Sequence, residues 1–181
     1  MKTGSIEAWP RIGSGVDIVD IAAFASQLQR EGSVFATVFS DKERAVLDLH
    51  TKQSFVFEGT LATTNAQGKE TENTAPPLPL HASLAARWAG KEAFVKAWSA
   101  LLVGRPPVIA EHDFCWEEVQ VLSDVWHRPY LHFTGHLAKC LQNWEHAQQV
   151  NVNWQISLSH DGNYAIALVQ ALATAHIPHT N

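Results

Sequence analysis

The sequence predicts an α+β protein in which an antiparallel sheet packs against one long helix, with one such module in the chain. Residues 150–158 alternate apolar and polar side chains with the period of a strand, and a tight turn at 161–163 reverses the chain into a further strand, 164–172. Residues 81–103 place apolar side chains at helical spacing, and Gly104 and two prolines end that helix.

The composition is that of one globular domain covering residues 1–181. A formal net charge of −5 argues against general nucleic-acid binding through a basic surface. The two cysteines make no disulfide framework, and no stretch approaches the roughly 20 apolar residues of a membrane span. We therefore expect a cytoplasmic protein with neither a nucleic-acid nor a membrane partner.

The N-terminal region is predicted to begin with a loose leader, residues 1–13, followed by a buried strand, 15–21, with the sequence GVDIVDI. Asp20 then caps a helix over 21–30, which Gly32 ends. This arrangement brings the chain from the sheet directly into its first helix.

The middle of the chain contains a second helix start and a long insertion. Ser40 occupies an N-cap position with Glu43 three residues later, which is the pattern of a capping box. Residues 51–79 are rich in Thr, Asn, Gly, Glu and Pro and offer little apolar surface to bury, so we expect a flexible insertion within the domain.

The last third contributes a hairpin and a short helix before the strand pair. Residues 116–124 and the sequence YLHFTG, 130–135, flank a turn at VWHRP and predict two paired strands. A short helix is expected over 136–144.

A carboxylate interrupts the first predicted strand. Asp17 lies among valines and isoleucines, where an unpaired charge costs several kcal/mol unless a cation or a partner compensates it. The alternative is that Asp17 ends the strand and caps a loop or meets an arginine. Asp20 is expected only to cap the following helix.

The long helix carries charges beside its apolar stripe. Glu92 and Lys96 lie one turn apart among small side chains, where another backbone or a ligand can approach closely. The alternative is an exposed ion pair that stabilises the helix by about 0.3–0.5 kcal/mol. Arg87 and Lys91 have like charge one turn apart, which suits an anionic ligand such as phosphate. The apolar stripe consists of Leu84, Trp88, Val95, Trp98 and Leu102, and the small neighbours are Ala85, Ala89 and Ser99.

The histidines allow two further interpretations. His160 shares the parity of the core-facing residues of its strand, whereas Ser159 points the other way, so His160 is either a hydrogen-bonded core residue or a phosphate donor. His132, His136 and Cys140 recur every four residues, but only the last two share a helix, which disfavours zinc. The chain contains neither GxxxxGK[ST] nor GxGxxG, so it lacks the usual nucleotide-binding motifs.

Three stretches, in order and spacing, resemble holo-acyl-carrier-protein synthase, the small bacterial class of 4′-phosphopantetheinyl transferase: GVDIVDI, ARWAGKEAFVKAW and SLSHDGNYAIALV. The resemblance covers residues 15–172 apart from the insertion, and FSDKER and WHRPYLHFTG also look like family segments. The insertion and the His-Arg-Pro turn are similar to those of the actinobacterial branch. The fold implied is that of 4′-phosphopantetheinyl transferases.

The resemblance implies Mg²⁺-dependent transfer of phosphopantetheine from coenzyme A to a serine of an apo acyl carrier protein, with release of 3′,5′-ADP, in fatty acid biosynthesis. Asp17 and Glu92 match the metal ligands, for Mg²⁺ or Mn²⁺, and Lys96 would contact the pyrophosphate; these are the implied catalytic residues. The coenzyme A contacts implied are Arg87, Lys91, Lys96, Arg128, Pro129, Ser159 and His160.

The chain departs from the family pattern at the turn and at the docking helix. His127 stands where the family usually has glycine, which puts the turn geometry of Arg128 and Pro129 in question. The helix 21–30 is poor in arginine, so carrier docking through Phe24, Gln27 and Arg30 is expected to depend only weakly on salt, as for a carrier domain held within a large fatty-acid synthase.

The resemblance also implies a homotrimer with sites between neighbouring subunits. Two other functions stay open from the residues alone. The carboxylate pair also fits a small nucleotide hydrolase, and the phosphate-binding residues also fit a non-catalytic subunit that binds coenzyme A or a carrier.

Overall fold

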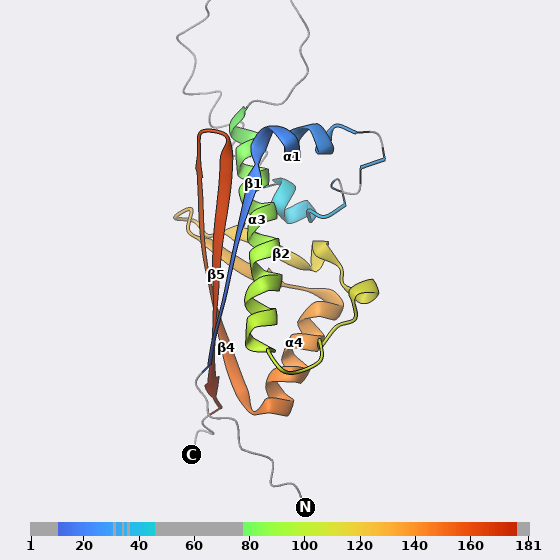
Figure 1. The fold of residues 1–181 in the computed structure, drawn as a ribbon, viewed down its shortest axis with the longest axis vertical. Coiled ribbons are helices and arrows are strands. Elements are labelled where there is room, and N and C mark those ends of the chain that lie inside the picture. The colour runs from blue at the N-terminus through green and yellow to red at the C-terminus, as the bar shows by residue number, and fades with distance from the viewer. Residues whose placement is uncertain (1–10, 31, 34, 36, 46–77, 177–181) are drawn as a thin grey trace, which may run out of the picture.

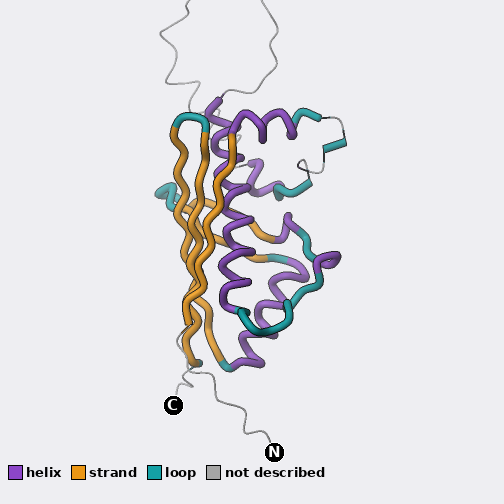
Figure 2. Tube along the Cα trace, viewed as in Figure 1, coloured by secondary structure: helices purple, strands orange, loops and turns teal. Residues whose placement is uncertain are grey.

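A computed structural model describes residues 11–176 except 31, 34, 36 and 46–77. Helix α3, Leu78–Leu101, runs the length of a three-stranded sheet and separates it from a second layer (Figure 1). All helices drawn lie on one side of that sheet, so its other face has no helix over it within the described residues (Figure 2). The α+β architecture predicted from the sequence is confirmed.

The large sheet has the order β1-β5-β4 and is antiparallel throughout. Its strands are β1, Arg11–Asp20, β4, Val150–Asp161, and β5, Tyr164–Ala175. The predicted strands are therefore present. The loose leader was predicted to extend to residue 13, and this limit was wrong, since Arg11 already pairs with Ala173. Arg11 and Ile12 can pair with β5 because Gly13, which follows them, lets the strand lie directly on α3.

The N-terminal helix, α1, spans Ile21–Leu28 and ends two residues before the predicted limit. Asp20 caps it as expected, because its carboxylate accepts a hydrogen bond from the Ala23 N–H at 2.8 Å. Residues 41–45 are helical, and the predicted capping box is present: the Ser40 N–H donates to Glu43 Oε2 at 2.9 Å, and the Glu43 N–H donates to Ser40 Oγ at 3.3 Å. The predicted insertion lies outside the described residues, except that α3 already begins at Leu78.

The second layer consists of a two-stranded hairpin and helix α4, Gly135–Gln148. The side chain of Glu118 caps α4, since its carboxylate accepts the N–H groups of His136 at 2.9 Å and Leu137 at 2.7 Å. Gly135 has φ +58, and a Cβ there would lie 1.9 Å from the Glu118 carboxylate, so this cap requires glycine. The remaining elements of this layer are η2, Glu111–Asp113, η3, Trp116–Glu118, β2, Val119–Ser123, and β3, Pro129–Phe133.

Helix α3 buries more of its surface than the apolar stripe that was predicted from the sequence. Its most buried side is rich in alanine, because Ala89, Ala93 and Ala97 face β1 and are fully buried. A second backbone, that of β1, does approach α3 closely, but it does so at Ala93 and Ala97, which were not among the small residues predicted beside Glu92 and Lys96. Helix α3 has 24 residues, yet among the described residues no helix combines the length and apolar character needed to cross a bilayer.

Candidate active site

Two glycines of β1 bring its carboxylate against α3. A Cβ at Gly13 would lie 2.2 Å from the Ala97 carbonyl oxygen, and one at Gly15 would lie 2.1 Å from the Ala93 carbonyl oxygen. Only glycine permits this close contact between strand and helix backbones. Asp17 lies two residues after Gly15 and therefore points to the same face of the sheet, toward α3. Its side chain reaches α3 beside Glu92 and Lys96.

Asp17 and Lys96 form an ion pair at the edge of this contact. Lys96 Nζ lies 2.7 Å from Asp17 Oδ1 and also donates to the Val16 carbonyl at 3.1 Å. The Lys96 side chain is 55% exposed, whereas that of Asp17 is only 13% exposed. The second carboxylate oxygen of Asp17, Oδ2, is buried and has no hydrogen-bond partner. A buried acceptor of this kind is costly, so it calls for a cation or for the proton of Glu92, whose side chain is placed to hydrogen-bond to Asp17.

Glu92 is the third member of the cluster. Burial, followed by the negative charge of Asp17, raises the pKa of Glu92 from 4.5 to about 7, while Lys96 and a hydrogen bond from Trp88 act in the opposite direction. Glu92 is half-buried, and near neutral pH its carboxyl group therefore exchanges readily between its neutral and ionised forms. A carboxyl group in this condition can hold a cation or accept a proton.

The donor set fits a hard divalent cation. Mg²⁺ prefers oxygen ligands and needs only one or two carboxylates when water and substrate phosphates supply the rest. Asp17 and Glu92 provide two carboxylates, and the unpartnered Asp17 Oδ2 is the oxygen that a cation would satisfy. Among the described residues, no group of three or more His, Cys, Asp or Glu side chains is placed to hold a metal, so an all-protein cage is not present there.

Lys91 departs from the expected contact with coenzyme A phosphates. Its side chain is 0% exposed, and Nζ lies 3.0 Å from the equally buried Glu43 Oε2. Nζ also donates to the carbonyls of Trp116 and Val119, so all three ammonium hydrogens are used. Burial lowers the pKa of Lys91, and the Glu43 charge opposes that shift. Lys91 therefore joins α3 to β2 and to residues 41–45, and no donor is left for a phosphate.

Arg87 lies one turn before Lys91 and is 5% exposed. One guanidinium nitrogen donates to the Ser83 carbonyl at 3.2 Å and to Ser83 Oγ at 2.5 Å. Its Nε is buried and has no hydrogen-bond partner. Arg87 thus retains a free donor, although only at the base of a largely buried side chain.

The hairpin tip between β2 and β3 is rigidly organised despite the departure at His127. His127 adopts φ +63, which is the left-handed conformation that glycine takes most readily. Asp124 fixes the turn: Oδ1 accepts the N–H groups of Trp126 and Arg128, each at 2.9 Å, and Oδ2 accepts Arg128 Nε at 2.7 Å. Hydrogen bonds from Arg128 hold the pKa of Asp124 below its usual value. Pro129 begins β3 directly after the turn.

Trp126 adds an exposed aromatic surface to this tip. It is 71% exposed, and the Arg128 guanidinium carbon lies 4.6 Å from the centre of its ring. Sequence reasoning missed Asp124 as the organiser of the turn. The signal was an aspartate two residues before Trp126, because an aspartate side chain commonly accepts the backbone N–H two residues later.

Ser159 and His160 lie near the end of β4 and point to opposite faces of the sheet. His160 pairs with buried Ala165, so it points to the predicted inner face of the sheet, which faces α3. It is nevertheless exposed and is not a core residue. It lies one residue before the end of β4. Ser159 pairs with Ile166 on the outer face, opposite to the face that carries Asp17. Within one chain these two residues do not meet at one pocket.

The three residues predicted to dock a carrier differ in exposure. Phe24 is 3% exposed and packs its ring against Phe35 and Phe39, with ring centres 5.5 and 6.3 Å away. The expected docking contact of Phe24 was therefore wrong, because its ring belongs to the core. Gln27 and Arg30 are exposed at the C-terminal end of α1 and remain accessible.

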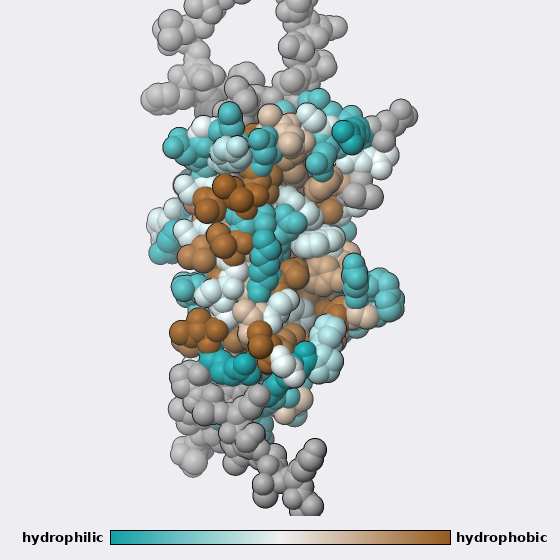
Figure 3. Space-filling view, in the orientation of Figure 1, coloured by the Kyte–Doolittle hydropathy of each residue, from teal (hydrophilic) through white to brown (hydrophobic). Residues whose placement is uncertain are grey.

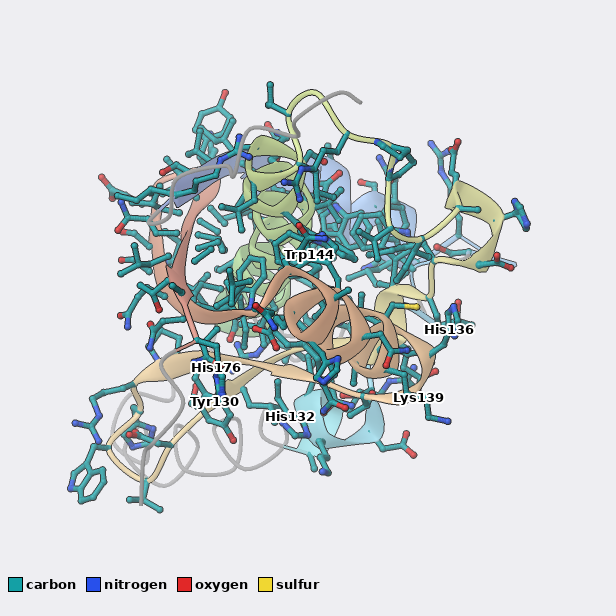
Figure 4. The ribbon with its side chains drawn as sticks, turned by 90° about the horizontal axis from the view of Figure 1, so that it is seen from below. Tyr130, His132, His136, Lys139, Trp144 and His176 are labelled. Carbon is teal, nitrogen blue, oxygen red and sulfur yellow. The ribbon has the colours of Figure 1, made fainter. Side chains whose placement is uncertain are left out.

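The disfavoured zinc interpretation gains no support. Cys140 Sγ lies 3.3 Å from His136 Nε2 on α4, but two side chains do not make up the four ligands of a structural zinc site. His132 comes from β3, well apart from His136 in the view from below (Figure 4). Both cysteines of the chain are free thiols.

Comparison with known proteins gives a consistent relationship. A family profile described as the 4′-phosphopantetheinyl transferase superfamily matches residues 13–169. A holo-[acyl-carrier-protein] synthase of Corynebacterium glutamicum is 36% identical over 156 residues, which is 86% of this chain and 94% of that protein. The corresponding protein of Mycobacterium tuberculosis is 31% identical over 157 residues, covering 87% and 93%.

Solved structures agree with the sequence relatives. The chain superposes on a structure named as a Chronobacterium ammoniagenes ACPS-CoA complex with a TM-score of 0.66 and 36% identity, covering 90% of this chain and 97% of that one. The acyl carrier protein synthase of Mycobacterium tuberculosis gives a TM-score of 0.53 at 26% identity, covering 88% and 95%. The cluster at Asp17, Glu92 and Lys96 lies within the matched residues.

Proposed function

Because the chain belongs to the 4′-phosphopantetheinyl transferase superfamily, we propose that it is a holo-[acyl-carrier-protein] synthase. It transfers 4′-phosphopantetheine from coenzyme A to a serine hydroxyl of an apo acyl carrier protein or carrier domain in fatty acid biosynthesis, and 3′,5′-ADP leaves. The observation that carries the proposal is the convergence of Asp17, Glu92 and Lys96 where β1 meets α3. The free thiols of Cys115 and Cys140 fit the reducing cytoplasm that we propose as its location.

Lys96 is the residue that we assign to the pyrophosphate. Its side chain is more than half exposed, and its ammonium group is held at the edge of the cluster by Asp17 and the Val16 carbonyl. At about 4 Å an ammonium attracts a phosphate by about 1 kcal/mol in water and about 4 kcal/mol in a partly shielded site. Lys96 can therefore turn from Asp17 to a phosphoryl oxygen and stabilise the charge that develops on the leaving group.

Asp17 and Glu92 are the residues that would hold Mg²⁺, or Mn²⁺. When bound, this ion supplies positive charge to the phosphoryl oxygens as the pyrophosphate breaks. Glu92 also lies in the cluster with a pKa of about 7, so it can take the serine proton directly or through one water. Asp17, whose side chain is 13% exposed, lies between a lysine and this carboxyl group and fixes the position of both.

The adenosine end of coenzyme A is assigned mainly to groups at the surface. Arg128 at the hairpin tip and His160 at the end of β4 are exposed, and Pro129 is partly buried. Arg87 is 5% exposed and would contribute through its buried Nε, which has no hydrogen-bond partner. Ser159 lies on the outer face of the sheet, so it can serve only a site shared with a second chain. Lys91 and Phe24 are left out because both are buried and engaged in other contacts. Gln27 and Arg30 remain the proposed carrier-docking residues.

The outer face of the large sheet supports the proposed homotrimer with sites between subunits. On this face Ile12 pairs with Leu172, Val16 with Leu168 and Ile18 with Ile166, and all six are 40% to 68% exposed. Apolar side chains gather in this region of the surface (Figure 3). The polar pair of Ser14 and Gln170 lies between the first two apolar pairs, but a cluster of exposed apolar side chains on one face is typical of an interaction site. We expect sedimentation to give the mass of three chains at micromolar concentration, and the mass of one chain would contradict this.

The function is tested by incubating the protein with coenzyme A, Mg²⁺ and an apo carrier domain and then measuring the carrier mass. A gain of one phosphopantetheine supports the proposal. Cleavage of coenzyme A without a modified carrier would instead indicate a hydrolase, and binding without any product would indicate a non-catalytic subunit. Glu92→Gln should lower the rate at least about 100-fold because it loses both a cation ligand and a proton acceptor. The exposed Glu117→Gln is the matched control, and full activity of Glu92→Gln would contradict the assignment.

A further inference from the structure

Trp88 lies one turn before Glu92 on α3, and rings from two other segments pack against its indole. The ring of Phe35, which follows α1, meets it edge-on, with ring centres 5.1 Å apart and an angle of 81° between the ring planes. The ring centre of Trp116, in η3, lies 4.8 Å away. Aromatic rings in contact favour defined geometries, so the indole of Trp88 has little freedom to rotate.

The two rings that contact Trp88 are themselves fixed by further aromatic contacts. Phe35 packs against Phe24, a buried residue of α1, with ring centres 5.5 Å apart. Trp116 packs against Phe114, with ring centres 4.9 Å apart. The orientation of the Trp88 indole is therefore determined by contacts from both ends of the described chain that precedes β2.

The Glu92 carboxyl group lies between Trp88 and Asp17. Side chains on a helix lean toward its N-terminus, so the Glu92 side chain covers the turn that begins at Trp88. The Trp88 side chain hydrogen-bonds to the Glu92 carboxyl group there, and Glu92 is also placed to hydrogen-bond to Asp17. An indole N–H can only donate, so it occupies one acceptor position of the carboxyl group and leaves the other positions open.

Trp98 shows that a tryptophan of α3 can pack without using its N–H group. It lies ten residues after Trp88, is 6% exposed and packs its ring against Phe94, with ring centres 5.8 Å apart. Its indole N–H is nevertheless buried without a hydrogen-bond partner. Trp98 therefore contributes by packing alone, whereas Trp88 also makes a polar contact with a residue of the catalytic cluster.

We propose that Trp88 is a positioning residue of the active site, whose indole N–H holds the Glu92 carboxyl group in the orientation in which it shares a cation with Asp17. The inference rests on the proposed function, in which Asp17 and Glu92 hold Mg²⁺. Glu92 is only half-buried and has several rotatable bonds, so without the indole its carboxyl group must be ordered when the cation binds. Groups that hydrogen-bond to ligating side chains typically change metal affinity by about 10- to 100-fold.

Trp88→Phe tests the inference because it keeps an aromatic ring beside Phe35 and Trp116 and removes the N–H donor. We expect its dissociation constant for Mn²⁺, measured by electron paramagnetic resonance of the free ion without coenzyme A or carrier, to rise about 10-fold. Trp98→Phe is the matched control, since it makes the same replacement on the same helix at an N–H without a partner, and it should bind Mn²⁺ as the wild type does. Equal Mn²⁺ affinities of the two variants would overturn the inference.

The dependence of carrier modification on Mg²⁺ separates positioning from packing. The Mg²⁺ concentration for half of the maximal rate should rise about 10-fold in Trp88→Phe, while kcat at saturating Mg²⁺ should stay within about threefold of the wild type. The KM for coenzyme A should not change, because Lys96 is retained. A loss of rate that excess Mg²⁺ does not restore would indicate a packing defect and contradict the inference. A wild type that leaves the carrier unmodified would instead overturn the proposed function, and the Mn²⁺ comparison, which needs no carrier, keeps the two failures distinct.

Discussion

Helix α3 carries two lysines that both pair with a carboxylate but serve different ends. Lys91 and Lys96 are five residues apart, so they point about 140° from one another around the helix. The Lys91–Glu43 pair is 0% exposed on both sides, whereas the Lys96 side chain is 55% exposed. The two pairs do not differ much in the distance between nitrogen and oxygen, which is 3.0 Å for Lys91–Glu43 and 2.7 Å for Lys96–Asp17.

The difference lies in how many partners each group has. Every hydrogen of the Lys91 ammonium has an acceptor, and Glu43 also receives the N–H groups of Ser40 and Val121. In the second pair, Asp17 keeps one oxygen without a partner and Lys96 faces solvent. A saturated, buried pair holds elements together, while an open pair can exchange its partners for a substrate.

The largest expected effect follows from breaking the closed pair. Lys91→Met leaves the Glu43 charge buried without compensation and two carbonyls unpaired, so we expect a loss of about 3–5 kcal/mol in the free energy of unfolding, measured by urea denaturation. Adding Glu43→Gln to Lys91→Met removes the charge but keeps only one acceptor oxygen, whereas the N–H groups of Ser40 and Val121 donate to different oxygens of Glu43. The double variant should therefore recover part of the loss. A Lys91→Met protein as stable as the wild type would show that the pair does not hold the fold together.

The open pair should behave in the opposite way. Lys96→Met is expected to change the free energy of unfolding by less than about 1 kcal/mol, because the side chain is largely solvated. Its kcat for carrier modification should fall about 100- to 1,000-fold, as when a group that stabilises developing charge is lost. Lys139→Met, at an exposed lysine of α4, is the matched control (Figure 4). If Lys96→Met kept its activity, the assignment of Lys96 to the pyrophosphate contact would be wrong.

The sequence predicted the open cluster better than the closed one. Asp17 and the Glu92–Lys96 spacing are local signals, because a charge within an apolar strand and a pair one turn apart can be recognised from neighbouring residues. The partner of Lys91 is 48 residues away, on the far side of the predicted insertion, and nothing local identifies it. The same two residues, Glu43 and Lys91, were each noticed for other reasons, as a capping residue and as a phosphate ligand.

The fold shows a similar limit. The element order was predictable from periodicity, yet the strand start at Arg11 depended on a close contact between Gly13 and α3, which is a tertiary property. Phe24 lies on a helix of eight residues, too short for its pattern to define one buried face, and its ring turned out to pack against Phe35 and Phe39. Asp124 could have been found, because its turn uses only neighbours within four residues.

The smallest expected effect concerns Glu92, whose environment is intermediate between the two pairs. Burial and the Asp17 charge raise the pKa of Glu92 to about 7, above the 4.5 that it has when unfolded, so between these values the folded protein binds the extra proton. The free energy of unfolding should therefore fall as pH rises from about 4.5 to about 7. For a half-buried group we expect about 1 kcal/mol over this window, after allowance for solvent screening.

Urea denaturation of the wild type and Glu92→Gln at pH 5 and pH 7.5 in EDTA measures this contribution. Glu92→Gln cannot titrate at this position, so the wild type should lose more stability than the variant between the two pH values. Mg²⁺ at pH 7.5 should restore the stability of the wild type, because a cation between the carboxylates offsets their repulsion, and should do little for Glu92→Gln. Equal pH slopes in the two proteins would mean that neither burial nor the Asp17 charge raises the pKa of Glu92 in the folded protein, and the open cluster would then be an ordinary surface pair.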